Sequence, residues 1–329
     1  MTSSPGPIGS CSPARPPVVL QRLWHASPPL TVVAALMVMA AGASLLAMLV
    51  DPRVITGAPA WLKPFKFTVS TFIYSLTLAG VFRWLADWPR VRRVVGWTTA
   101  IVFVLEVAII GVQAWRGTAS HFNISTPLDT VLFGVMGAGI GIQTLTSVAV
   151  VVALCRQDFS DRALGWALRL GMLLTVAGAL TGPLMTRPTP EQLAKARAKE
   201  RMTAAGAHSV RGQDGGPGLP VTGWSREHGD IRVPHFIGLH AIQVLGLVAL
   251  GLRRWRRPED VRVKAALAAA TSYGSLFFLL LGQAMRGQSV VATGELPWLG
   301  VWAMGTLLVF TWITVGSRRQ ARDEDWVTS

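Results

Sequence analysis

Apolar runs of about twenty residues alternate with short polar, arginine-rich segments along most of this chain. A helix needs roughly 20 apolar residues to cross the hydrocarbon core of a bilayer. Eight runs reach that length, so the pattern predicts eight transmembrane helices. They lie at 30–50, 64–82, 96–115, 129–154, 165–185, 234–252, 265–285 and 297–315. The predicted fold class is therefore an all-α polytopic membrane protein.

Lysine and arginine are distributed unevenly between the two sets of loops that this pattern defines. Cytoplasmic loops usually hold the excess of both residues. The rich set comprises Arg83, Arg90, Arg92 and Arg93, then Arg156 and Arg162, then Arg253, Arg254, Arg256, Arg257, Arg262 and Lys264, and Arg318, Arg319 and Arg322 in the tail. The opposite short loops hold few. This distribution predicts that both termini are cytoplasmic and that the long segment 186–233 lies outside.

The polar segments complete the predicted organisation. Residues 1–28 are rich in Pro and Ser and are expected to be a disordered cytoplasmic N-terminus. Four-helix halves follow at 29–155 and 163–316, the second interrupted by the extracytoplasmic loop 186–233, and 317–329 form a cytoplasmic tail. Within the loop, 190–202 predicts a short surface helix. The rest of the loop, rich in Gly and Pro, is either a flexible linker or a lid that Leu219 and Trp224 pack over the helix ends.

An internal repeat relates the two halves. The stretches WLKPFKFTVSTF and IRVPHFIGLHAI align Pro64 with Pro234, an offset of 170 residues. The same offset aligns Gln113 with Gln283 and Arg116 with Arg286. The alignment predicts a tandem 4+4 pseudo-repeat whose halves have the same orientation in the membrane.

Composition narrows the class of protein and its partners. The chain is 51% hydrophobic and only 15% charged, too apolar to cover a soluble globule of 329 residues. The net charge of +14 does not indicate a nucleic acid partner, because the arginines lie between apolar runs. The expected partner is the lipid bilayer, and protein partners are unknown. Cys11 and Cys155 have no CxxC spacing, so neither a disulfide nor a cysteine-based zinc site is expected.

Histidines gather where the predicted spans meet the outer face. In RVPHFIGLHAIQ, His235, His240 and Gln243 share one broad face of a helix, and the helix dipole favours a neutral ring at His235. His121 lies in the outer loop before the fourth span, and His208 lies in the long outer loop. His121, His235, His240 and Gln243 are candidate cofactor-binding residues, and His121, His208 and His235 are candidate metal ligands. The cofactor is unknown, with haem or a divalent metal as the options, and the alternative is interface histidines bonded to backbone carbonyls.

Glu106 lies near the middle of the third span, where an acid is costly enough to indicate a role. Gln113 and Arg116 follow on the same helix face, and Lys66 in the second span is a candidate ion partner. Glu106 is the candidate catalytic or proton-handling residue, and the alternative is a protonated side chain used for packing. The predicted substrate path is lined by Lys66, Gln113, Arg116, Gln283 and Arg286.

The repeat is broken where these charges lie. The residues aligned with Glu106 and Lys66 are Leu276 and Phe236. An asymmetry of this kind is expected where two similar halves enclose a single central site.

The stretches LKPFKF, SHFNISTPLD, DGGPGLPVTGWS and RVPHFIGLHAIQ together resemble a group of uncharacterised bacterial integral membrane proteins. The resemblance covers nearly the whole chain beyond the N-terminal segment. It implies a multi-pass fold in a bacterial inner membrane and implies no activity. The architecture is also similar to that of haem A synthase, but the eighth span has no histidine and the Glu-x-x-His signature near the second span is missing. That similarity is an analogy of architecture only.

Three functions follow as hypotheses, and whether the protein is an enzyme stays open. The first is a haem- or metal-binding, redox-type protein with its site at the extracytoplasmic face. The second is a small-molecule or ion transporter with a path between the two halves, to which Gln243 would contribute. The third is an extracytoplasmic metal-dependent membrane hydrolase, with Asp129 or Asp214 joining the histidine ligands. A scaffold without a small-molecule site is the remaining alternative.

Overall fold

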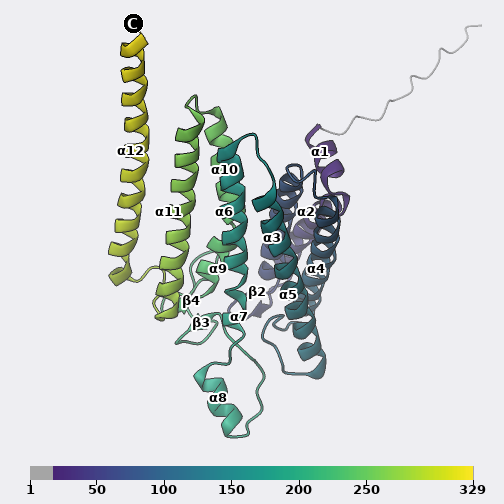
Figure 1. Cartoon of the computed structure of the whole chain (residues 1–329). Helices are drawn as coiled ribbons and strands as arrows, with labels where there is room; N and C mark the ends of the chain where they lie inside the picture. The colour runs from purple at the N-terminus through teal and green to yellow at the C-terminus, as the bar shows by residue number, and fades with distance from the viewer. Residues whose placement is uncertain (1–17, 329) are drawn as a thin grey trace, which may run out of the picture.

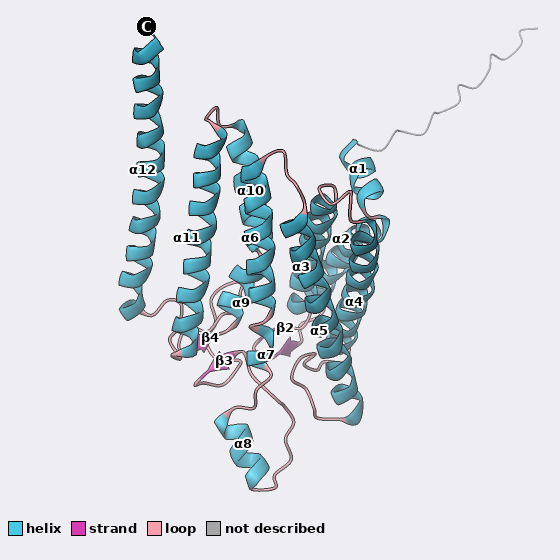
Figure 2. Cartoon of the chain, in the orientation of Figure 1, coloured by secondary structure: helices cyan, strands magenta, loops and turns pink. Residues whose placement is uncertain are grey.

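Long helices make up most of the protein in a computed structural model that describes residues 18–328. The only strands within that range are two antiparallel pairs of two residues each (Figure 2). The first pair joins β1 (Val54–Ile55) to β2 (Ala58–Pro59), and the second joins β3 (Ser209–Val210) to β4 (Gly229–Asp230). The predicted all-α fold class is confirmed.

The N-terminal part of the chain forms five helices. They are α1 (Val18–Ala26), α2 (Pro28–Val50), α3 (Leu62–Phe82), α4 (Pro89–Trp115) and α5 (Pro127–Arg156). Prolines start α2, α4 and α5, where the missing amide hydrogen removes no helical bond. At the start of α5 the Thr126 side chain accepts a hydrogen bond from the amide of Asp129 and so caps the helix.

The C-terminal part has a similar series of helices with an inserted loop. They are α6 (Arg162–Ala179), α7 (Gly182–Met185), α8 (Pro190–Arg197), α9 (Arg232–Leu239), α10 (Ala241–Arg254), α11 (Glu259–Met285) and α12 (Leu296–Thr328), with a 3-10 turn, η1 (Thr293–Glu295), before the last. The helix predicted at 190–202 exists but ends at Arg197. Thr189 and Gln192 form a capping box at its start.

Seven of these helices are long and apolar enough to cross a membrane. An eighth crossing results if α9 and α10 count as one span, although a bend of 41° separates them. The sequence predicted a continuous helix at 234–252, and that prediction is wrong at the point where His240 interrupts it. Seven or eight apolar crossings agree with the predicted number of spans.

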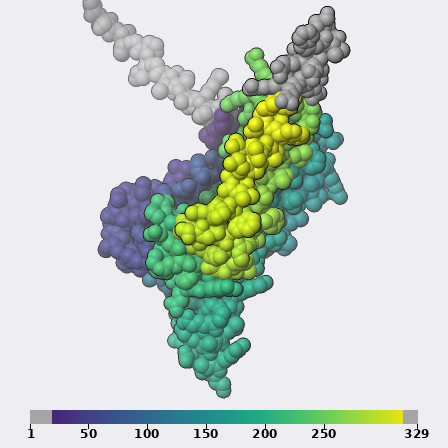
Figure 3. Space-filling model, turned by 90° about the vertical axis from the view of Figure 1, so that its left-hand side faces the viewer, coloured from purple at the N-terminus to yellow at the C-terminus, as the bar shows by residue number. Residues whose placement is uncertain are grey.

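The helices stand side by side, and both ends of the described chain lie at the same end of the bundle (Figure 1). We call this the terminal end, and we call the opposite end, where α8 and the loop 186–231 lie, the loop end. The loop and α8 project from the body of the protein (Figure 3). The expectation of a disordered segment 1–28 is wrong for Val18–Ala26, which is helical, and residues 1–17 lie outside the described residues.

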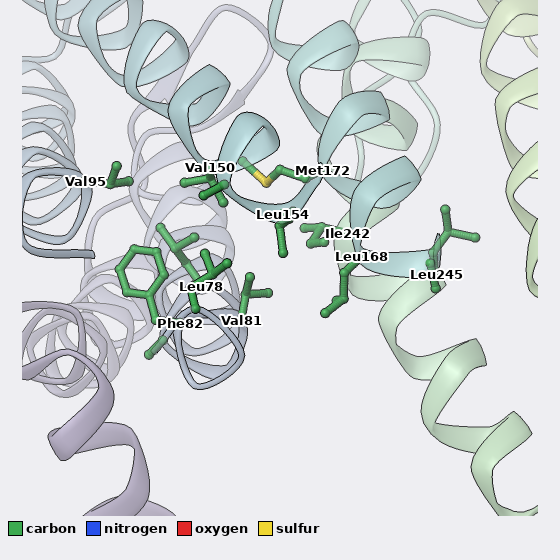
Figure 4. Close-up of a cluster of buried hydrophobic side chains, with 14 of the residues drawn as sticks. Leu78, Val81, Phe82, Val95, Val150, Leu154, Leu168, Met172, Ile242 and Leu245 are labelled. Atoms are coloured by element: carbon green, nitrogen blue, oxygen red, sulfur yellow. The ribbon is translucent and has the colours of Figure 1, made fainter. Parts of the chain in front are cut away.

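The largest apolar cluster joins the two series of helices near the terminal end. Side chains from α3, α4, α5, α6 and α10 interlock there (Figure 4). They include Leu78, Val81, Phe82, Val95, Val150, Leu154, Leu168, Met172, Ile242 and Leu245. Each contributes roughly 1.5–3 kcal/mol when it is removed from water, although less when it moves from lipid. The contact between the two series of helices is therefore closed by apolar side chains at this end.

Candidate functional site

Glu106 and His121 form the centre of a polar cluster at the loop end of the first half. Glu106 lies on α4 and is 5% exposed, and His121 lies in the loop between α4 and α5. The distance from His121 Nε2 to Glu106 Oε1 is 3.6 Å, which is too long for a good hydrogen bond. The other ring nitrogen, Nδ1, lies 3.2 Å from Ser120 Oγ. The carboxyl group and the imidazole therefore face each other without a direct hydrogen bond.

Lys63, in the first turn of α3, supplies the nearby positive charge. It interacts electrostatically with Glu106 and Asp214, and its Nζ lies 5.9 Å from the centre of the Phe67 ring. The sequence suggested Lys66 as the ion partner of Glu106. That suggestion is wrong in the structure, because Lys66 Nζ donates to the carbonyl oxygen of Thr222 in the long loop at 3.1 Å.

His121 is neutral near pH 7. Burial, reinforced by the positive charge of Lys63 and by His208 and His235, holds the pKa of His121 well below its usual range. Its ring also contacts Phe67, with ring centroids 5.6 Å apart. A neutral imidazole with one nitrogen toward a carboxyl group can accept the proton of that group, and the transfer creates an imidazolium–carboxylate pair.

His208 and Asp214 form a second polar pair within the long loop. His208 Nδ1 donates to Asp214 Oδ2 at 2.7 Å, and the Asp214 carboxylate also accepts from the backbone amides of His208 and Ser209. Burial opposes ionisation of Asp214, but these bonds hold its pKa well below the usual range. The His208 ring packs edge-on against Phe122, with centroids 4.9 Å apart. The loop thus closes over the first half as a packed lid, the second of the two states expected for it.

His235 is fixed on α9 by a contact with α6. Its Nδ1 lies 2.9 Å from the Gly178 carbonyl oxygen and 3.0 Å from Thr181 Oγ1. Because a carbonyl oxygen only accepts, Nδ1 carries the proton and Nε2 keeps its lone pair. Electrostatic interactions link His235 to His208 and His121. The predicted gathering of these three histidines at one end of the bundle is therefore present in the structure.

His240 and Gln243, the other two candidate residues of the stretch RVPHFIGLHAIQ, lie at or just after the break between α9 and α10. His240 lies at the break, and its ring stacks against Phe236 with centroids 4.3 Å apart. The side-chain amide of Gln243, oriented to satisfy both groups, donates to the carbonyl oxygens of Leu239 and His240 at 3.2 and 3.1 Å. Gln243 thus adds a side-chain bond at the break, where the His240 carbonyl oxygen also accepts from the backbone amide of Val244. Its predicted role as a cofactor ligand stays a prediction.

The residues predicted to line a substrate path hold the ends of helices. Arg116 and Gln113 bind the Asp129 carboxylate at 2.6 and 2.9 Å, and Arg116 also donates to Gln113. In the second half Arg286 pairs with Glu295 at 2.8 Å, and Gln283 donates to the carbonyl oxygen of Ser289 at 2.6 Å. Both sets fasten the helix that follows.

The metal and haem ligands named from the sequence stay predictions. In the part of the chain that the structure describes, no three or more His, Cys, Asp or Glu side chains lie close enough together to hold a metal ion. The sequence did not single out Lys63, Ser120 or Thr181, which are the immediate neighbours of the site. The one available signal was that Lys63 lies one residue before the aligned proline Pro64.

These features define an all-α multi-pass membrane protein with a buried acid–histidine pair at one end of its helix bundle. Comparison of the chain with family models, curated proteins and solved structures finds no significant match.

Proposed function

We propose that the protein is a transporter of a small polar solute or ion, with its binding site at the loop end around Glu106, His121 and Lys63. The observation that carries the proposal is the buried carboxyl group of Glu106, which faces the neutral imidazole of His121 and interacts electrostatically with Lys63. Ionisable groups at such depth are costly and usually serve ion or solute movement.

The broken helix supports this proposal over a permanently bound cofactor. Transporters often build their sites from interrupted helices whose free backbone groups contact the cargo. The break at His240 lies in the span that also carries His235. The lid is attached at both sides of the site, since Lys66 binds Thr222 and Arg232 donates to the carbonyl oxygen of Gly223 at 2.7 Å. Loops that close over a site in this way commonly gate access to it.

A tandem repeat is the second part of the proposal. Helices α4 and α11 both have 27 residues and start 170 residues apart. Each ends in a left-handed glycine, Gly117 with φ 75° and Gly287 with φ 81°. Each is followed by a helix held by an arginine–carboxylate pair, as described above. Two halves of equal orientation are one of the two repeat arrangements found among secondary transporters.

We further propose that the loop end is extracytoplasmic and that the membrane is a bacterial inner membrane. The short loops at the terminal end carry most of the arginines of the short connections, including Arg83, Arg90 and Arg257. Such loops remain in the cytoplasm. The solute would therefore reach the site from outside the cell.

The apolar cluster between the halves would then be the inner gate. It separates the polar site from the terminal end in the present conformation. Transport requires a second conformation in which this cluster opens, whereas a protein that only binds a cofactor or metal keeps it closed. Whether this cluster opens therefore distinguishes transport from the binding of a cofactor or metal.

The test is the reactivity of a cysteine placed in the gate. The variant Leu78→Cys is made in a Cys11→Ser, Cys155→Ser background, and inverted vesicles are treated with a membrane-impermeant thiol reagent. We expect slow but complete labelling, faster when the vesicles contain a transported solute. Leu145→Cys, at a side chain 73% exposed on the lipid-facing surface, is the unreactive control. A Leu78→Cys protein that stays unlabelled for hours would argue against transport, and a Soret band in the purified protein would favour haem.

A further inference from the structure

A column of buried polar side chains runs inward from Glu106 through the first half of the protein. On α4, Gln113, Glu106 and Thr99 are spaced by seven residues, so they lie on one face of the helix. Gln113 binds Asp129 at one level of α5, and Thr99 binds Gln143 at another. Asp129 and Gln143 are fourteen residues apart, so Glu106 lies midway between these two interhelical contacts.

The inner part of the column is a network of hydroxyl and amide groups. Thr99 Oγ1 donates to Gln143 Oε1 at 2.9 Å, and Gln143 lies 3.5 Å from Ser147 Oγ. The hydroxyl group of Tyr74 on α3 hydrogen bonds with Ser147 and Gln143. Three helices therefore meet at this level through polar groups, beside the edge-on packing of Tyr74 against Phe103 of α4.

Helix α3 lines the column with a row of hydroxyl groups. Thr68, Thr71 and Ser75 are all buried and lie on one face of α3. Ser75 is fully buried, and its hydroxyl group has no hydrogen-bond partner. A buried hydroxyl without a partner is rare in proteins, and an internal water molecule is the usual solution.

The second half has a corresponding series of helices, in which the counterpart of α3 is broken between α9 and α10, and it lacks this column. At an offset of 170 residues, polar side chains of the column have apolar counterparts, whereas the residues at the helix ends are kept. The pairs are Thr71 with Ala241, Ser75 with Leu245, Thr99 with Ala269, Glu106 with Leu276 and Gln143 with Ile313, against Gln113 with Gln283 and Pro127 with Pro297. The fold therefore does not require the polar groups. A hydroxyl and amide network beside the buried acid, whose aligned positions in the second half are mostly apolar, indicates a function of that acid.

We infer that this column holds a chain of water molecules and carries protons between Glu106 and the inner part of the membrane. Seven residues of helix span about 10 Å between Glu106 and Thr99, a gap that two or three waters can bridge. In each step one O–H bond breaks and another forms, so no oxidant or other reactant is needed. The groups that face Glu106 are Lys63 of α3 and His121 of the α4–α5 loop. The inference rests on the proposed transport function and makes the proton its driving ion.

Proton flux tests the inference directly. Purified protein is reconstituted into liposomes that contain the pH-sensitive dye pyranine, and a potassium gradient with valinomycin imposes a membrane potential. We expect proton uptake well above that of protein-free liposomes, and at least a tenfold loss of uptake in Gln143→Leu and Thr99→Val. The matched control is Thr77→Val, the same substitution on the neighbouring helix α3, because Thr77 donates to the Ile73 carbonyl and is only half-buried. Uptake equal to that of protein-free liposomes, or uptake unchanged in both column variants, overturns the inference.

A second experiment tests for water in the column. It decides the inference even if Gln143→Leu or Thr99→Val fails to fold. Ser75→Cys, in the background without other cysteines, is a small change at the unpartnered hydroxyl. We expect a small thiol reagent added from the loop side to label it, and the lipid-facing Leu145→Cys to stay unlabelled. A Ser75→Cys protein that elutes normally and resists the reagent shows a dry column and overturns the inference. Gate labelling at Leu78→Cys without proton flux would leave the transport proposal standing and reject only the proton path.

Discussion

The ring of His235 is tied to the backbone of Gly178, with 2.9 Å between Nδ1 and the carbonyl oxygen. This bond exists because α6 and α9 approach at a pair of glycines. A methyl group at Gly178 would lie 2.5 Å from the backbone of Gly238, closer than real side-chain carbons come. The position of one candidate site residue therefore depends on the absence of a side chain on another helix.

Gly178→Ala should displace α9 and lower stability by roughly 2 kcal/mol, the usual cost of overpacking. The displacement should also weaken the His235 bond and reduce activity in any transport assay. The measurement is the midpoint of thermal unfolding in detergent. Gly182→Ala is the control, because its added carbon would meet only ordinary contact at 3.7 Å from His235. Equal midpoints for both variants would contradict this explanation of the close approach.

The Arg116–Asp129 pair should contribute more to the free energy of unfolding than a surface ion pair does. Asp129 is 2% exposed and is bonded by Arg116, Gln113 and Thr126. Asp129→Ala leaves these donors without their acceptor, and we expect a loss of roughly 3 kcal/mol. Thermal unfolding measures it against Asp260→Ala, whose partner lies at 4.0 Å on an exposed helix surface. A loss below about 1 kcal/mol would place the pair among ordinary surface bridges.

Stability should fall as the pH is lowered from 7.5 to 5.5. His121 has a folded pKa well below its usual value of 6.5, so the unfolded chain takes up a proton that the folded protein does not. Stability from this group is complete above pH 6.5 and decreases below it, by about 1.4 kcal/mol at one pH unit below 6.5. Thermal unfolding of the wild type and of His121→Gln over this range measures it. The variant should show the smaller pH dependence, and identical curves would reject the contribution of His121.

The two ends of the bundle should react from opposite sides of the membrane. Cys155 is exposed at the terminal end of α5, and Glu200 lies in the exposed loop beyond α8. We expect an impermeant maleimide to label Cys155 only in inverted vesicles. Glu200→Cys, in the background without other cysteines, should be labelled only in intact cells from which the outer barrier has been removed. Labelling of both from one side would refute the proposed topology.

The helices of this protein could be predicted from the sequence because hydropathy is a local property. A run of apolar residues must become a helix in lipid, whatever surrounds it, since every backbone group needs a partner. The surface helix after Pro190 followed from similarly local rules. The offset of 170 residues was also visible, because it is a pattern in the letters themselves.

The partners of the charged side chains could not be predicted in this way. Lys63 and Lys66 are three residues apart on the same helix, and only the rotation of α3 against α4 and the folding of the loop decided that Lys63 lies near Glu106 and Lys66 binds Thr222. The break at His240 likewise arises where α9 crosses α6 at Gly178 and Gly238, a contact between distant segments.

By itself, the sequence predicted an all-α membrane protein with eight crossings, an acid in one span and histidines near the ends of others. Tertiary structure alone decided that His121 faces that acid, that the polar column occupies one half, and that aliphatic side chains close the interface near the terminal end. The physical reason is that lipid selects helices through their own composition, whereas a site depends on the rotation and depth of several helices relative to one another.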